Sequence, residues 1–290
     1  MSISAVAGFT GLHWDTVKTI EKRYLARKYA KVPFRDVRRL GIDEVYLGRK
    51  FGFITVVRNL ESGAVLFVGK GKGGDALKPL KGRLLRRAKQ IEVVAIDMSN
   101  AYAAWLKEVL PDTDIVYDHF HVIKLMNERM DTLRRSTMNK LEEEQKKALK
   151  GKRFLLLRNQ EDLHAKAQEE LEKLRLEYKD LGTASMMKEY LRNIYKIAES
   201  VSTARKAFTL WCAKAEASAI NCLKQMAKTI RKRMAGLLAF WKYDGITNAS
   251  QEGFNNKIGW FTRQAYGYRD QAFLHLKIYD LPNLSTRKEL

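Results

Sequence analysis

The chain has 290 residues, and its 54 Lys and Arg outnumber its 33 Asp and Glu, which gives a formal net charge of +21. This length allows one elaborated domain or two. A hydrophobic content of 46% with only four prolines excludes a disordered tail and a collagen-like rod. The excess of positive charge predicts a polyanionic partner, with nucleic acid as the first candidate.

Neither the cysteines nor the apolar segments indicate a secreted or membrane protein. Cys212 and Cys222 are too few for a disulfide framework, and neither belongs to a paired metal-ligand motif. We expect both to be small core residues in a reducing compartment. The sequence has no 18-residue apolar run and no basic segment followed by an apolar stretch at its start. We therefore expect a soluble, intracellular protein without membrane contact.

Two short helices are expected over residues 4–24. Their spacing suits the turn and second helix of a helix-turn-helix unit, with a glycine at the tight corner; the residues that carry it are Ala7, Gly11, Leu12, Val17 and Ile20. A plain amphipathic helical hairpin explains the same spacing. We assign residues 1–36 to a partial helix-turn-helix segment that binds DNA.

From residue 40 the apolar pattern changes to that of strands. We predict an antiparallel meander over 40–47, 52–59 and 64–68, followed by a strand, a helix and a strand over 91–96, 102–109 and 114–117. The fourth strand is almost entirely apolar, as expected for a strand buried on both faces. The fold class is therefore α/β, with a mixed five-stranded sheet in which the first and fourth strands can be neighbours.

Residues 122–246 show helical periodicity and are expected to form an all-helical insertion. Within it we predict one helix over 163–181 that ends at Gly182. The insertion divides a catalytic domain into a first part, residues 37–121, and a final helix with the C-terminal tail, residues 247–290. In that last part Glu252, Asn256 and Arg263 lie along one face of the helix.

Three carboxylates could hold a metal ion. Asp43 stands in an apolar strand, where an unpaired charge is costly, and Asp97 directly follows the buried strand Val-Val-Ala-Ile. On adjacent strands the two would face each other, and a divalent cation would relieve their repulsion. Glu252, on a helix beyond the insertion, could complete a two-metal site. Oxygen ligands alone favour Mg²⁺ or Mn²⁺.

Each of these residues also has an ordinary structural explanation. Asp97 could cap the helix that follows, Asp43 could pair with an arginine, and Glu252 could be a surface residue. Asp118, His119 and His121 cannot all converge on one ion if they continue a strand, because alternate residues face opposite ways. A structural or DNA-contacting role is favoured for them.

Four sequence blocks resemble the signature blocks of the ISL3-type insertion-sequence transposases; they are GIDEVYLGR, AIDMSNAY, VYDHFHVIKLMN and NASQEGFNNKIGWFTRQAYGYRD. They occur in the order of that family, and the resemblance covers about residues 4–280. It implies membership of the DDE superfamily, whose catalytic domain is RNase H-like. The family commonly has a Cys-rich zinc-binding segment before a complete helix-turn-helix. The N-terminal part of this sequence has no cysteines, so the chain resembles a truncated member. Such a truncation is expected to impair recognition of the terminal inverted repeats.

The resemblance implies that Asp43, Asp97 and Glu252 are the DDE triad and bind two Mg²⁺ (or Mn²⁺) ions. Asp118 and His121 match a block beside the site, and Asn256 is also placed near it. The implied partners are double-stranded DNA, as transposon ends and as target, and further copies of the chain in a synaptic complex. The implied location is the bacterial cytoplasm, in association with the nucleoid.

The reaction implied is phosphoryl transfer in DNA. One ion held by Asp43 and Asp97 would activate water or a 3′-hydroxyl, and a second, shared by Asp43 and Glu252, would stabilise the leaving oxygen. Phosphate contacts are expected from basic residues near Glu252 and in the insertion, namely Lys257, Arg263, Arg269, Lys124, Arg134 and Arg135. Two alternatives stay open, a non-catalytic sequence-specific DNA-binding protein and an RNase H-like nuclease without strand transfer.

Overall fold

The computed structural model describes residues 1–265 and 267–284 and divides the chain into two compact units. The first unit comprises residues 1–115 and 248–290, and the second comprises residues 116–247. The predicted insertion, residues 122–246, lies inside the second unit, whereas residues 116–121, which we assigned to the catalytic part, also belong to it. Among the helices of the described residues, none has the length and apolar character needed to cross a bilayer.

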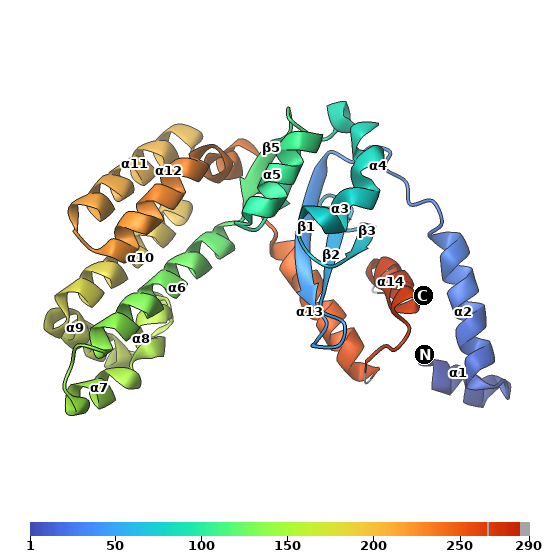
Figure 1. Cartoon of the computed structure of the whole chain (residues 1–290), viewed down its shortest axis with the longest axis horizontal. Helices are drawn as coiled ribbons and strands as arrows, with labels where there is room; N and C mark the ends of the chain where they lie inside the picture. The colour runs from blue at the N-terminus through green and yellow to red at the C-terminus, as the bar shows by residue number, and fades with distance from the viewer. Residues whose placement is uncertain (266, 285–290) are drawn as a thin grey trace. The chain divides into compact units, whose positions relative to one another are not determined.

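The first unit is built around the predicted mixed sheet (Figure 1). Its strands follow the order β3-β2-β1-β4-β5, with β1–β2 and β2–β3 antiparallel and β1–β4 parallel. Their bounds are β1 (Arg39–Tyr46), β2 (Phe53–Asn59), β3 (Val65–Lys70), β4 (Val93–Ile96) and β5 (Asp114–Tyr117). The mixed α/β fold expected from the sequence is thereby confirmed, with the strand arrangement of an RNase H-like core.

Two C-terminal helices cover one face of this sheet. α13 (Ala249–Gln264) and α14 (Gln271–Asp280) bring Phe254, Ile258 and Leu274 against the apolar side chains of β1, β2 and β3. Val45 of β1 and Val56 of β2 belong to the same core cluster, and both are almost fully buried. Since successive strand residues face opposite sides, this core fixes which residues of β1 point toward α13.

The other face of the sheet is covered by α5 (Asn100–Val109), with α3 (Gly74–Leu77) and α4 (Lys81–Leu85) beside it. Tyr102 of α5 is 1% exposed, and its hydroxyl donates to Glu44 Oε1 at 2.8 Å and lies 2.9 Å from Thr55 Oγ1. The amide of Gly73 donates to the same hydroxyl at 3.1 Å. Burial raises the pKa of Tyr102 well above its usual value. Glu44 is thus directed away from the face that Asp43 occupies.

The two N-terminal helices expected from the sequence are confirmed as α1 (Ile3–Thr10) and α2 (Trp14–Lys28). Gly11 ends α1 in the left-handed conformation, at φ 72°, which favours glycine. α2 lies against α14, where Lys22 Nζ donates to Asp270 at 2.7 Å. The side chains of Phe9 and Ile20 are exposed. A DNA-binding role for this hairpin stays a prediction.

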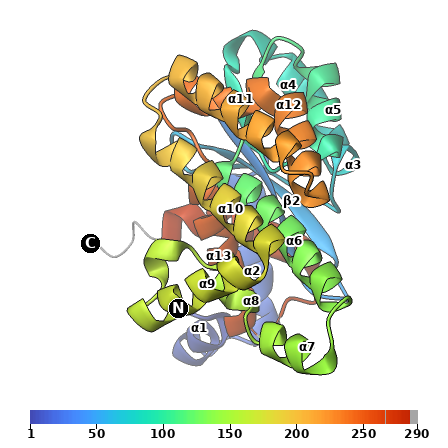
Figure 2. The ribbon, with the colours of Figure 1, turned by 90° about the vertical axis from the view of Figure 1, so that its left-hand side faces the viewer.

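The second unit includes the last two residues of β5, Val116 and Tyr117, and its other regular elements are helices. α6, α9, α10, α11 and α12 form its main layers (Figure 2). α10 packs against α6, α9 and α11, and α12 packs against α6 and α11. The bounds are α6 (His119–Met138), α7 (Glu143–Lys150), α8 (Arg153–Leu157), α9 (Ala165–Glu177), α10 (Lys179–Ile197), α11 (Val201–Ala217) and α12 (Asn221–Lys242). Cys212 and Cys222 are both buried in this core, as expected, and burial raises the pKa of each thiol to about 11.

Gly182 does not end a helix, so the prediction of one helix over 163–181 is wrong. α9 ends at Glu177, and α10 begins at Lys179 and continues through Gly182. The glycine is needed for a different reason. A Cβ atom at position 182 would lie 2.4 Å from the carbonyl oxygen of Arg175, on the last turn of α9. The glycine therefore allows the backbones of two consecutive helices to approach closely.

The Gly182→Ala variant is expected to destabilise the second unit by about 1–3 kcal/mol, the usual cost of forcing an extra methyl into a packed site. The clash is with backbone atoms, which cannot move aside as a flexible side chain would. Thermal unfolding followed by circular dichroism measures the effect. Gly151→Ala is the matched control, because nothing lies within 4 Å of a Cβ atom there. Equal melting temperatures for the two variants would contradict this explanation.

Candidate metal and DNA site

The parallel pairing of β1 with β4 predicts corresponding positions for Asp43 and Asp97. Arg39 pairs with Val93 and Gly41 with Ala95, so partner numbers differ by 54. Asp43 and Asp97 differ by the same 54 and stand two residues beyond the Gly41–Ala95 pair, where the pairing ends. Continuation of the register would set the two carboxylates side by side on one face, with Asp43 inside β1 and Asp97 one residue beyond the end of β4. Ligands of α/β sheets commonly bind just beyond the carboxyl ends of the strands, where Asp97 lies.

Asp43 is partly buried and held by named hydrogen bonds. Its Oδ2 accepts from Asn255 Nδ2 of α13 at 2.7 Å, and its Oδ1 accepts from the backbone amide of Glu44 at 2.8 Å. The first bond joins β1 to α13 and fixes the orientation of the carboxylate. These two bonds come from an amide side chain and from the backbone; a pairing of Asp43 with an arginine, the ordinary alternative, stays a prediction.

Three amide side chains attach α13 to the sheet. Asn248 Nδ2 donates to the carbonyl oxygen of Ile42 at 3.2 Å, and Gln251 Nε2 donates to that of Val56 at 3.2 Å. Asn255 Nδ2 donates to Asp43, as described above. Asn248 and Gln251 are 1% and 0% exposed. Because positions three and four apart share a helix face, these bonds fix the rotation of α13 about its axis.

Glu252 lies on the flank of that anchored face. It is four residues after Asn248 and three before Asn255, and its side chain is exposed. The same rotation leaves Glu252 beside the anchored face rather than on it. An exposed side chain changes rotamer in picoseconds to nanoseconds, without repacking the core. Figure 1 shows α13 lying along the sheet beside β1.

A buried arginine supports the first turn of the same helix. Arg58 of β2 is 7% exposed, and its Nη1 donates to the carbonyl oxygen of Ser250 at 2.7 Å. Its guanidinium also lies 4.2 Å from the ring centroid of Phe254 and donates to Gly63. Burial lowers the pKa of Arg58 to about 10. Arg58 therefore secures the helix start from which Glu252 projects.

Asp97 does not cap α5, the ordinary role that we had considered for it. The cap position of α5 is Ser99, and Asp97 Oδ1 accepts from the backbone amide of Ser99 at 2.9 Å. This bond joins Asp97 to the turn between β4 and α5. Asp97 itself is partly exposed.

The donor types suit a hard divalent cation, since all three predicted ligands are carboxylates. Within residues 1–265 and 267–284, no three His, Cys, Asp or Glu side chains lie close enough together to hold a metal ion. The β1–β4 register predicts the positions of Asp43 and Asp97 relative to each other, whereas Glu252 lies on α13 and its side chain is exposed. A metal bound here would draw its third ligand from that exposed side chain.

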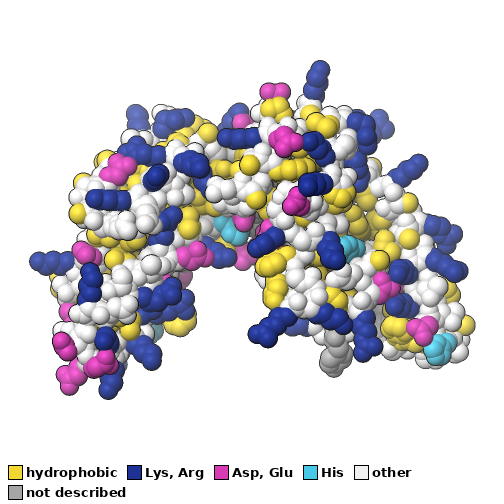
Figure 3. Space-filling model, in the orientation of Figure 1, with side chains coloured by type: hydrophobic (Ala, Val, Ile, Leu, Met, Phe, Trp, Pro, Cys, Tyr) yellow, Lys and Arg dark blue, Asp and Glu magenta, His cyan; other side chains and the backbone are white. Residues whose placement is uncertain are grey.

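The basic candidates in the first unit differ in accessibility. Arg263 and Arg269 are exposed, as is Asn256, whereas Lys257 is partly buried and its Nζ donates to the carbonyl oxygen of Leu281 at 3.0 Å. Figure 3 shows Lys and Arg side chains over both units on the face displayed, with fewer Asp and Glu. The two arginines are therefore better placed than Lys257 to meet a phosphate.

The remaining candidates lie in the second unit. Lys124 and Arg135 are exposed, but Arg134 is 7% exposed and holds Asp131 at 2.8 Å. Asp118 is 3% exposed and caps α6, accepting from the amide of Phe120 at 3.1 Å. Burial acts to raise the pKa of Asp118, but His119 and this amide outweigh it, and the pKa is lowered. His121 is partly buried on the first turn of α6.

Four residues that organise the site were missed by sequence reasoning, namely Arg58, Asn248, Gln251 and Asn255. A signal existed for three of them, because Asn and Gln recur at intervals of three and four in the run from Asn248 to Asn255. Such a repeat places amides on one helix face. Arg58 gave no signal, because an arginine in a strand is usually read as an exposed residue.

Comparison with known proteins gives matches to transposases. The model of the ISL3 transposase family, described as a transposase, matches residues 40–278. The transposase for insertion sequence element IS1001 of Bordetella parapertussis is 32% identical over 281 residues, covering 96% of this chain and 69% of that protein. The transposase for IS1557 of Mycobacterium tuberculosis H37Rv is 27% identical over 306 residues, covering 97% of this chain and 68% of that protein.

Proposed function

This chain belongs to the ISL3 family of transposases, and we propose that it cleaves DNA strands and joins their 3′ ends to a target in a Mg²⁺-dependent reaction. The observation that carries the proposal is the parallel pairing of β1 with β4, in which partner numbers differ by 54, the same difference as between Asp43 and Asp97. Two carboxylates on neighbouring parallel chain segments, beside a helix that carries Glu252, suit phosphoryl transfer with metal assistance.

The chain's own residues have distinct parts in this proposal. Asp43 and Asp97 supply rigid carboxylate oxygens, because β1 and β4 hold their backbones. Asn255 keeps the Asp43 carboxylate in one orientation through its 2.7 Å bond. Glu252 contributes an exposed carboxylate from a helix whose rotation is fixed by Asn248 and Gln251. Arg263 and Arg269 would bind DNA phosphates, which fixes position but not sequence.

The metal ions would be held by Asp43, Asp97 and Glu252. When bound, they supply Lewis-acid stabilisation of the charge that develops on the phosphate and on the leaving oxygen.

The Glu252→Gln variant is expected to lose Mg²⁺-dependent nicking of supercoiled DNA by about a hundredfold or more, because it removes the only ligand that comes from α13. It should fold normally, since Glu252 is exposed. Glu108→Gln is the matched control, because that exposed glutamate lies on α5 and pairs with Lys81 at the surface. Undiminished nicking by Glu252→Gln would contradict its place in the reaction.

Strand transfer separates the proposal from a simple nuclease. Oligonucleotides with pre-cleaved 3′-hydroxyl ends are incubated with a supercoiled plasmid, the chain and Mg²⁺, and covalent joining is measured on denaturing gels. We expect joined products with the wild type and none with Glu252→Gln. Nicking without any joining would favour the RNase H-like nuclease, and neither activity would favour a DNA-binding protein.

A further inference from the structure

The second unit contains a cavity of about 890 Å³, within the size range of small-molecule sites. One wall is a stripe along α6 in which Phe120, Lys124, Asp131 and Arg135 follow at helical intervals. From Phe120 to Arg135 the stripe extends over roughly 22 Å, at 1.5 Å per residue. Five basic and two acidic side chains line the cavity, so it favours an anionic occupant.

Three arginines converge on one carboxylate at one end of the stripe. Asp131 is 8% exposed and contacts Arg134 at 2.8 Å, Arg135 at 3.4 Å and Arg153 at 3.3 Å. Burial acts to raise the pKa of Asp131, but the arginines outweigh it, and the pKa is lowered. One carboxylate cannot neutralise three guanidinium groups. Asp131 therefore holds Arg135 and Arg153 in place without fully neutralising their charge. Their side chains are 65% and 48% exposed, so both guanidinium groups can still bind a phosphate.

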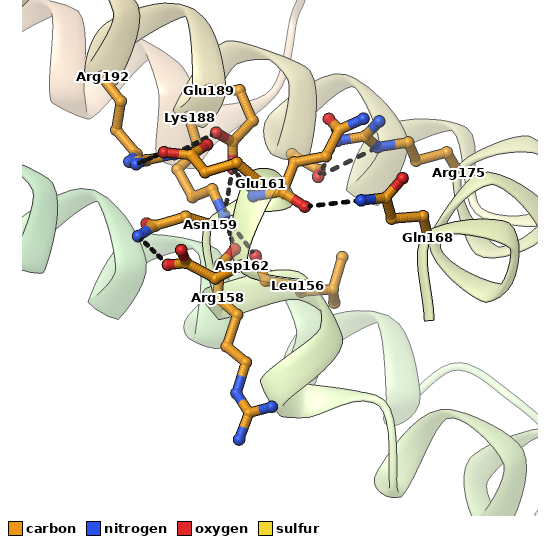
Figure 4. A network of polar contacts seen from close by, with 12 residues as sticks. Leu156, Arg158, Asn159, Glu161, Asp162, Gln168, Arg175, Lys188, Glu189 and Arg192 are labelled. Atoms are coloured by element: carbon orange, nitrogen blue, oxygen red, sulfur yellow. Dashed lines mark hydrogen bonds and ion pairs between the residues drawn. The ribbon is translucent and has the colours of Figure 1, made fainter. Parts of the chain in front are cut away.

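The opposite wall of the cavity is supported by fixed ion pairs (Figure 4). Arg192 contacts Glu161 at 2.7 Å and Glu189 at 2.5 Å, and Lys196 contacts Glu161 at 2.5 Å. The buried Lys188 donates to the carbonyl oxygens of Leu156 at 3.0 Å and Arg158 at 2.5 Å. These bonds fix the segment between α8 and α9 that gives Asn159 to the cavity.

Aromatic side chains supply the remaining surface. His119, Tyr195 and Phe240 line the cavity and pack together, with ring centroids 5.4–5.7 Å apart. Phe120, at the start of α6, is 49% exposed. Lys124 follows Phe120 by one helical turn, and an exposed aromatic ring beside a basic side chain is a combination that binds unpaired nucleotides.

Three buried polar atoms of cavity-lining residues have no hydrogen-bond partner within residues 1–265 and 267–284. They are His119 Nδ1, Asn127 Oδ1 and the hydroxyl of Tyr195. His119 Nδ1 lies 3.4 Å from a carboxylate oxygen of Asp118, which leaves Asn127 and Tyr195. A buried polar group without a partner is costly, and an occupant with donors and acceptors of its own, as a nucleobase has, could supply one.

We propose that this cavity binds an unpaired nucleotide of a DNA strand, with the base against Phe120 and its phosphate on Lys124, while phosphates further along the same strand reach Arg135 and Arg153. The proposal rests on the proposed function for its choice of DNA as the polymer. A base-paired nucleotide would present only its sugar–phosphate backbone to a concave site of this kind. An unpaired nucleotide presents both a ring face and phosphates, and both have matching surfaces here.

The test uses the full chain in EDTA, so that no metal-dependent cleavage occurs. The probes are a DNA duplex with one extrahelical 2-aminopurine and the same duplex with that base paired. Fluorescence anisotropy gives the two dissociation constants, and 2-aminopurine quenching reports stacking. We expect the wild type to bind the extrahelical probe about tenfold more tightly and to quench it, since stacking of one base contributes about 1–3 kcal/mol.

Two variants and their matched controls decide the result. Phe120→Ala should abolish both the preference and the quenching, whereas Leu210→Ala, which removes a similarly exposed side chain outside the cavity, should not. The double variant Arg135→Gln, Arg153→Gln should weaken binding of the extrahelical probe about tenfold more than the exposed Arg205→Gln does. Circular dichroism checks that each variant is folded.

Equal affinity of the wild type for the two probes would overturn the proposal, as would an unchanged preference in Phe120→Ala. Displacement of the probe by micromolar deoxyadenosine monophosphate would overturn the assignment to a DNA strand and indicate a site for free nucleotides. Because binding is measured without metal, its outcome is independent of nicking. A preserved preference in a chain that never nicks DNA would reject the proposed function alone.

Discussion

The Asp43→Asn variant is expected to lose about a thousandfold of the Mg²⁺-dependent nicking rate while it keeps its fold. Loss of a carboxylate ligand removes several kcal/mol of charge stabilisation, and each 1.36 kcal/mol is a factor of ten in rate. The fold should persist, because an asparagine has the same shape and its one oxygen can still accept from Asn255; the bond from the Glu44 amide is lost. Nicking of supercoiled DNA is measured over a Mg²⁺ titration.

A double variant of Asp43 and Asp97 tests whether the two carboxylates serve one metal site. If both carboxylates serve one metal site, the Asp43→Asn, Asp97→Asn double variant should nick no more slowly than either single variant, because residues that act as a unit are not additive. If the two residues acted independently, their separate losses of nicking rate would multiply in the double variant. A thermal shift supplies a measure that does not depend on activity, since Mg²⁺ should stabilise the wild type and neither single variant. Stabilisation of Asp43→Asn by Mg²⁺ equal to that of the wild type would refute the shared site.

The sheet could be predicted because each of its strands has a recognisable apolar pattern within a few consecutive residues. The apolar run of β4 requires burial on both faces, and this requirement places β4 beside β1 in the interior of the sheet. From that pairing, the correspondence of Asp43 and Asp97 follows by counting residues. The first two members of the predicted triad were thus accessible to sequence reasoning because they lie on neighbouring strands.

Features that depend on contacts distant in sequence could not be predicted in this way. Asn255 is 212 residues from Asp43, and nothing local indicates that its amide meets that carboxylate. Gly182 misled us for a related reason. A glycine after a periodic helix is typical of a helix end, whereas here the constraint comes from the backbone of Arg175 on the preceding helix. In both cases the residue type is set by a neighbour that only the folded chain supplies.

The Asn255→Leu variant is expected to reduce nicking about 10–100-fold, the usual effect of removing a residue that orients a metal ligand. Leucine has a similar size but no donor, so the Asp43 carboxylate would lose the bond that joins it to α13. Asn248 and Gln251 still attach the helix to the sheet, and Glu252 should keep its place. The defect should therefore appear mainly as a higher Mg²⁺ concentration for half-maximal nicking.

Comparison with Asn255→Asp separates loss of orientation from loss of packing. That variant keeps the shape of the side chain but sets a carboxylate 2.7 Å from Asp43 Oδ2 in place of a donor. Two carboxylates at this distance cannot both ionise easily, so one pKa must rise and the apparent affinity for Mg²⁺ should increase with pH. Gln264→Leu, at the exposed end of α13, is the control for added apolar surface. An Asn255→Leu protein with the Mg²⁺ dependence and rate of Gln264→Leu would show that Asp43 needs no support from α13.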